Sequence, residues 1–158
     1  MKSVFLAVCV ITIGAMLAPG ALASQVQEFR DEADQYYQEQ NFKKAYRVYY
    51  KLAKVGDHYS QHRISQMHAN GEGTKLDLTE AYAWSTLAAE SGKENLINSS
   101  DELLQMNDDK ARAEKRAAKL KKKYGKEVLT IRAKKQAERD SYSRSGRCTG
   151  SNLGCARS

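Results

Sequence analysis

The chain has 158 residues, enough for one modest domain, and carries 26 basic and 19 acidic side chains, a net charge of +7. Hydrophobic residues make up 41% of it and charged residues 28%, which excludes a disordered or collagen-like chain. One proline and three phenylalanines are too few for a turn-rich β-sandwich, whereas good helix formers are plentiful. The composition therefore predicts an all-α protein.

Residues 1–23 are predicted to be a cleaved secretory signal peptide. Lys2 provides a positive start, residues 4–18 form an apolar run, and Ala21 and Ala23 provide a small-x-small cleavage site. The alternative is a transmembrane anchor, but the apolar run is shorter than the roughly 20 residues needed to span a bilayer. The pattern therefore predicts export, to the periplasm or as a secreted protein.

Export would also determine the state of the cysteines. Cys9 would be removed with the signal peptide, which leaves Cys148 and Cys155. An even number of cysteines in an exported chain indicates a disulfide, here one that closes a short loop.

Charge is distributed unevenly along the rest of the chain. Residues 24–109 contain 9 basic and 15 acidic side chains, whereas residues 110–158 contain 16 basic and 4 acidic ones. In the cytosol such a basic tail would suggest nucleic acid, but predicted export argues against that partner. Anionic lipid, acidic polysaccharide and other proteins remain as partners, and a merely solvated helix surface is the plainer interpretation.

Two segments of the predicted body repeat at an interval of 36 residues. Each is helix-length and ends in a glycine, the residue that best tolerates the left-handed position after a helix. A further helix is predicted for residues 60–70, and Asp77 or Thr79 can cap the helix that follows the Gly-rich turn. The matching positions are Ala45-Tyr46, Leu52-Ala53 and Gly56 in the first copy and Ala81-Tyr82, Ala88-Ala89 and Gly92 in the second.

Residues 60–92 resemble a Sel1-like repeat, a relative of the tetratricopeptide repeat. Ser65, His68 and Thr74 depart from the family pattern, but its spacing is intact. The resemblance implies a short solenoid of antiparallel helix pairs that binds partner proteins. The positions that match the motif are Gly71, Gly73, Asp77, Ala81, Trp84, Ala88, Ala89 and Gly92.

The flanking segments are similar to weaker copies, so that the repeats would occupy residues 24–124. Residues 29–56 resemble a degenerate first copy, and residues 93–120 a worn third pair in which Asn107 is the expected N-cap of the second helix. We expect the last helix to act as the C-terminal cap of the stack, because solenoids need atypical end units.

Residues 125–158 are predicted to form a basic helical extension with a flexible tail. The apolar spacing of the last helix continues past Gly125 to Ile131, so this helix is expected to bend or break at the glycine. From Ser141 onward the chain is rich in Ser, Gly and Arg, which predicts a loosely ordered end.

Residues with catalytic or metal-binding potential are few. His58 and His62 are four residues apart and could present two imidazoles to a metal, but no third ligand is evident. The chain has no Gly-x-Ser-x-Gly motif, and Gly71-Glu72-Gly73 lacks the third glycine of a phosphate-binding loop. We therefore expect a protein that is not an enzyme and binds no cofactor.

Tyrosine is the residue type that suggests binding, since seven tyrosines lie between residues 36 and 82. Adjacent tyrosines cannot both point into one core, so some rings should reach the surface, where tyrosine favours interfaces. Packing between helices is the plainer interpretation for most of them. If a partner binds along the first helices of the repeats, the expected contact residues are Tyr36, Tyr37, Gln40, Arg63, Gln66 and His68.

The sequence thus predicts an exported, non-catalytic protein–protein interaction module, an adaptor or scaffold. One alternative is a cell-envelope surface binder whose basic tail contacts anionic lipid or polysaccharide. An enzyme of unspecified class is a second alternative.

Overall fold

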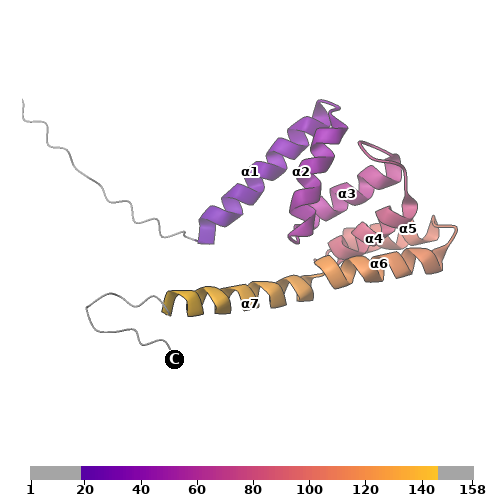
Figure 1. The fold of residues 1–158 in the computed structure, drawn as a ribbon. Helices are drawn as coiled ribbons and strands as arrows, with labels where there is room; N and C mark the ends of the chain where they lie inside the picture. Colours follow the sequence, from indigo (N-terminus) through magenta and orange to yellow (C-terminus); the bar gives the residue numbers. More distant parts are fainter. Residues whose placement is uncertain (1–18, 146–158) are drawn as a thin grey trace, which may run out of the picture.

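The computed structural model describes residues 19–145, with side chains for residues 24–143, and this part of the chain is all helical (Figure 1). The prediction of an all-α protein is confirmed. The helices are α1 (Pro19–Gln38), α2 (Phe42–Lys54), α3 (His58–Asn70), α4 (Leu78–Ala89), α5 (Glu94–Gln105), α6 (Lys110–Tyr124) and α7 (Lys126–Ser145).

Three helices begin at an aspartate. The side chains of Asp57, Asp77 and Asp109 each accept a hydrogen bond of 2.9 Å from the backbone N–H three residues later, at the starts of α3, α4 and α6. Each bond satisfies one of the amide groups that a helix leaves unpaired at its N-terminus. Of the two predicted caps of α4, Asp77 takes this role, and Thr79 lies within the helix.

Asn107 is not the N-cap of α6, and that prediction is wrong. It lies three residues before the helix and is buried, and its amide donates hydrogen bonds to the carbonyl oxygens of Leu103, at 2.7 Å, and Leu78, at 3.0 Å. These bonds tie the end of α5 to the start of α4. Asp109 immediately precedes α6 and takes the capping role.

The predicted Gly-rich turn joins α3 to α4 and brings the backbone close to α2. Gly73 has a φ of 70°, and a Cβ atom added there would lie only 2.4 Å from the carbonyl oxygen of Phe42. Only glycine therefore fits this position without displacement. Gly71 ends α3 in the left-handed conformation, as does the predicted closing residue Gly92 after α4.

The core runs from α1 to α4 and continues into α6. Trp84 is 2% exposed, and its ring centroid is 5.6 Å from that of Tyr50 and 5.8 Å from that of Tyr124. Ala81 and Ala88 are fully buried, which allows neighbouring helices to approach closely, and Ala89 is partly exposed. Other core members are Ala33, Ala45, Tyr49, Ala53, Ile64, Met67, Ala83, Leu87, Ala117 and Leu120.

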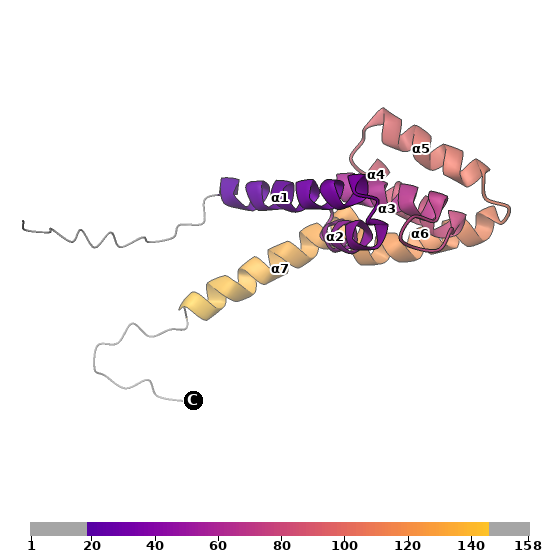
Figure 2. The ribbon, with the colours of Figure 1, turned by 90° about the horizontal axis from the view of Figure 1, so that it is seen from above.

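The helix α6 packs mainly on α4 and only slightly on α5. Arg116 donates to Glu80 at 2.5 Å, and the backbone N–H of Lys126 donates to Glu90 at 2.7 Å. In both contacts the two residues are 36 positions apart in the chain. This is the same interval at which the helix-length segments of the sequence repeat. Figure 2 shows α5 lying apart from α6 on the other side of α4. The expected third pair of residues 93–120 is therefore corrected, since its two helices pack separately on α4.

The last helix breaks where the sequence predicts. Tyr124 ends α6, Gly125 is extended with a ψ of 152°, and α7 starts at Lys126 and extends beyond the body (Figure 1). The prediction of a loosely ordered tail is wrong for Ser141 to Ser145, because α7 continues to Ser145. The charged and alanine-rich segment before them favours helix, and the helix propagates through these serines.

The remaining terminal predictions fall largely outside the described residues. Cys148 and Cys155 lie beyond α7, so their disulfide stays a prediction. The helix α1 begins at Pro19, which places the predicted cleavage point after Ala23 inside its first two turns. Between residues 19 and 145, none of the helices combines the length and the apolar character needed to cross a bilayer.

The ion pair of Asp57 with Arg30 joins the start of α3 to α1 and makes stability depend on pH. Burial alone would raise the pKa of Asp57, but hydrogen bonds from Arg30 and Ser60 outweigh burial and hold this pKa below its ordinary value. The resulting stabilisation is present above the unfolded pKa of about 3.9 and is lost as the pH falls through the lower, folded pKa.

Asp57→Asn keeps a side chain that can cap α3 and removes the charge. We expect it to lower the free energy of unfolding at pH 7 by about 1 kcal/mol. We also expect a smaller loss of stability than in the wild type between pH 5 and 2. Urea unfolding at each pH measures both effects, with the exposed Asp108→Asn as the control. Parallel pH profiles for wild type and Asp57→Asn would contradict the assignment.

Candidate interaction surface

Five of the six predicted contact residues are at least partly accessible to solvent. They lie on α1, on α3 and in the turn after α1. We call the accessible face formed by these residues the α1–α3 surface. Gln40 is exposed in the turn, with a φ of 58°, and the other four side chains are partly buried. The members of this surface are Tyr36, Tyr37, Gln40, Arg63 and Gln66.

His68 does not belong to this surface, which corrects its predicted role. It is 7% exposed, and its Nε2 atom lies 3.1 Å from the Tyr46 hydroxyl of α2. His68 lies one helical turn after the fully buried Ile64, so it shares the face of α3 that packs into the body. It therefore helps to join α3 to α2 and is not accessible to a partner.

Arg63 is the centre of the α1–α3 surface. Its guanidinium carbon is 4.1 Å from the ring centroid of Tyr37 and 5.6 Å from that of Tyr49, and Nη1 donates to Gln66 at 3.0 Å. Its Nε atom is buried and has no hydrogen-bond partner among the described residues. Burial opposes the charged form of Arg63, but the nearby Tyr49 hydroxyl and other phenols raise its pKa overall. The group therefore stays cationic, held between tyrosine rings.

Carboxylates hold the surrounding tyrosines in place. Asp34 accepts hydrogen bonds from the hydroxyls of Tyr49 and Tyr59, the latter at 2.7 Å. Burial, assisted by Asp34, raises the pKa of Tyr59 to about 12 and also raises the pKa of Tyr49. Both phenols are therefore protonated donors at any physiological pH.

The two tyrosines of α1 are positioned by different partners. The Tyr37 hydroxyl donates to Glu72 at 2.6 Å, a bond that raises the pKa of Tyr37, and its ring packs edge-on against Phe42. The Tyr36 ring lies 5.2 Å from the Lys44 ammonium. The sequence did not reveal these partners, because each lies on a different helix or loop from its tyrosine. Tyr37 is thus a packed residue with one accessible edge.

A cleft of about 600 Å³ lies beside this surface, between the starts of α3 and α5. It contains His58 and His62, the pair considered for metal binding, together with Lys93. The Nδ1 atom of His58 is within hydrogen-bond distance of Gln61. Burial, and then Arg63, lowers the pKa of His62, so this imidazole is neutral at pH 7. Among residues 24–143 no three His, Cys, Asp or Glu side chains are grouped to hold a metal ion.

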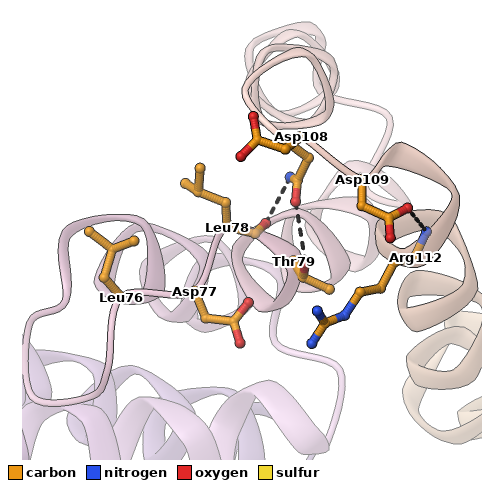
Figure 3. Close-up of a pocket in the computed structure, with 8 residues that line it drawn as sticks. Leu76, Asp77, Leu78, Thr79, Asp108, Asp109 and Arg112 are labelled. Carbon is orange, nitrogen blue, oxygen red and sulfur yellow. Dashed lines mark hydrogen bonds between the residues drawn. The ribbon is translucent and has the colours of Figure 1, made fainter.

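A smaller cleft of about 380 Å³ lies where α4 and α6 begin side by side (Figure 3). Asp77 and Asp109 stand at the two helix starts, and Arg112 extends between them. Thr79 donates to the amide oxygen of Asn107 at 3.3 Å. Both aspartates already cap helices, and Asn107 is already hydrogen-bonded. The polar groups of this cleft therefore hold α4, α5 and α6 together.

Comparison with known proteins gives no family. No family model, curated protein or solved structure matches this chain at a significant level. The resemblance to Sel1-like repeats therefore stays a prediction from the motif, and function is inferred from the surfaces of the molecule.

Proposed function

We propose that this chain is an exported adaptor of the helical-repeat type and that it binds a partner protein along the α1–α3 surface. In this proposal α1–α2 and α3–α4 are two antiparallel repeat units, and α6 is the second helix of an incomplete third unit. Packing of α6 on α4 at a 36-residue offset supports this assignment.

The arrangement around Arg63 carries the proposal. A partly buried guanidinium is fixed against Tyr37 and Gln66. Arginine and tyrosine are the residue types that most often dominate binding energy at protein interfaces. Because this side chain is already ordered, a partner that pairs with it loses little conformational entropy.

Exposed side chains on the same helices extend the surface. Phe29 on α1 is 51% exposed, and Tyr59 on α3 is 40% exposed. The outer face of α1 and the turn after it also carry exposed acidic residues: Glu28, Asp31 and Glu32 on the helix and Glu39 in the turn. A partner with basic side chains around an apolar or aromatic centre would complement this surface in both shape and charge.

The basic end of the chain supports the alternative of an envelope-surface binder. Residues 130–143 of α7 are exposed throughout, so their Lys and Arg side chains are accessible to an anionic surface. This contact would be electrostatic and would weaken with salt, unlike a packed protein interface.

The proposal is tested by first identifying the partner and then measuring its affinity. A photo-crosslinking amino acid at Gln66 captures proteins in contact with the α1–α3 surface in the envelope fraction, and Lys134 on α7 is the control position. The captured protein is purified, and its binding to variants of this chain is measured by calorimetry.

Phe29→Ala is expected to weaken binding at least tenfold, a loss of about 1.4 kcal/mol, without lowering the melting temperature. Ile131→Ala is the matched control, since Ile131 is a similarly exposed apolar residue on α7. Equal effects of the two substitutions would refute the assignment of the α1–α3 surface. Tyr37→Ala is unsuitable for this test. The ring of Tyr37 packs on Phe42 and Arg63, so its removal would also destabilise the fold.

A further inference from the structure

Beyond its first turn, which contains Lys110 and Arg112, the cations of α6 divide into two groups. On the inner side, Arg116 forms an ion pair with Glu80 and Lys121 with Glu90, and these pairs fasten α6 to α4. On the outer side, four exposed lysines form no salt bridge with any described residue. Three of them follow one line along the helix and define the α6 lysine stripe: Lys115, Lys119 and Lys122. The fourth, Lys123, lies over the Tyr124 ring, with its ammonium 5.1 Å from the ring centroid.

The spacing of the stripe places it on one face of the helix. Steps of three and four residues keep side chains on the same side, about one charge for each 5.4 Å turn. The opposite face carries the buried Ala113, Ala117 and Leu120, which pack on α4. Glu114 is the one acidic residue of α6; it is exposed and lies about 100° around the helix from Lys115.

Lys122 lies in the last turn of α6, where a cation is favoured by the helix dipole, but Lys115 and Lys119 lie earlier in the helix and form no salt bridge with a described residue. Like charges three or four residues apart on a helix each cost about 0.2–0.5 kcal/mol. On the exposed helix α7 acidic residues offset part of this cost, since Glu138 lies four residues after Lys134, although Lys135 and Arg139 still form a like-charged pair at that spacing. In contrast, the α6 lysine stripe has a single sign of charge.

We propose that the α6 lysine stripe binds a linear anionic polysaccharide through the carboxylate or sulfate groups of the polymer. A uronic-acid polymer carries one charge per sugar ring, and a ring's length is comparable to one turn of the helix. Lysine suits this role, since its ammonium is a point charge without the planar geometry by which arginine selects particular groups.

The shape and composition of the stripe favour a polysaccharide over other polyanions. A row one side chain wide fits a line of charges better than it fits a membrane plane. Single-stranded nucleic acid would need exposed aromatic rings for base stacking, whereas Tyr124 at the end of α6 stacks on the buried Trp84. The choice of polysaccharide over nucleic acid also rests on the export included in the proposed function.

The test measures binding of the purified chain to polygalacturonate at several salt concentrations. The α6 variant carries Lys115→Gln, Lys119→Gln and Lys122→Gln, and the matched α7 variant carries Lys134→Gln, Lys135→Gln and Arg139→Gln. Both lose the same charge from exposed positions. We expect the α6 variant to bind at least 30-fold more weakly and the α7 variant to change by less than threefold. The dependence of log affinity on log salt should become shallower by about 2 in the α6 variant, by analogy with lost phosphate contacts.

Further measurements distinguish binding at the α6 lysine stripe from non-specific electrostatic attraction of the polymer to the basic protein. Lys115→Arg, Lys119→Arg and Lys122→Arg together retain the charge and should restore binding to within threefold of the wild type. Equal losses in the α6 and α7 variants would overturn the site. Tighter binding to vesicles of anionic lipid, or to DNA, than to polygalacturonate at equal salt would overturn the polysaccharide. These measurements use purified protein, so they are independent of the partner captured on the α1–α3 surface.

Discussion

Trp84→Ala is expected to lower the free energy of unfolding by about 3–5 kcal/mol, the range for truncating a large buried ring. The indole is 2% exposed and lies between the rings of Tyr50 and Tyr124, so its removal leaves a cavity where α2, α4 and α6 meet. Small domains are stable by only about 5–15 kcal/mol. The substitution should therefore remove much of the stability of the protein, as measured by urea unfolding followed by circular dichroism.

Met106→Ala is the control, because Met106 is 59% exposed after α5 and should change stability by less than 0.5 kcal/mol, about the usual size of a surface effect. An unchanged midpoint for Trp84→Ala would mean that the indole is accessible in solution, in conflict with the packing between α4 and α6.

Gly73→Ala is the second substitution that we expect to lower the stability of the protein strongly. Its new Cβ atom would lie 2.4 Å from the carbonyl oxygen and 2.6 Å from the carbonyl carbon of Phe42, and backbone atoms cannot rotate away as a side chain can. The left-handed φ of 70° adds about 1–2 kcal/mol for a residue with a Cβ. We expect a total loss above roughly 3 kcal/mol, as found for severe steric changes.

Gly92→Ala isolates the conformational part of that cost. Gly92 has a φ of 79°, but a Cβ atom there would meet nothing within 4 Å. We therefore expect a loss of about 1–2 kcal/mol, from the backbone conformation alone. Thermal and urea unfolding of the two variants side by side measures the difference. Equal losses would show that the turn after α3 moves away from Phe42 at little cost.

Helix positions could be predicted from local signals, because caps and closing glycines act within a few residues. Asp77 and Gly125 are examples, since each marks a helix boundary that the structure has at the same place. The packing of α6 on α4 also had a signal in the sequence. The 36-residue interval that relates Ala45 to Ala81 leads next to Ala117, and all three alanines are buried.

The side-chain network of the α1–α3 surface could not be predicted in the same way. Asp34 meets Tyr49 and Tyr59 only after three helices have packed, and nothing local to any of them shows the contact. The burial of His68 did have a local signal, its spacing from Ile64 and Met67. That signal indicates packing, and it outweighs the position of His68 on the first helix of its repeat, from which the contact role was predicted.

The dependence of α4 on a later helix has a kinetic consequence. The main helix contacts join elements that are one or two apart in the chain, a local topology associated with folding in microseconds to milliseconds. Helices α1 to α4 can therefore associate as the chain emerges from a translocation pore or a ribosome. The indole of Trp84, however, stays uncovered on one side until Tyr124 has emerged and α6 has docked. Because Trp84 is the only tryptophan of the chain, its fluorescence during refolding would report the moment at which the last part of the core closes.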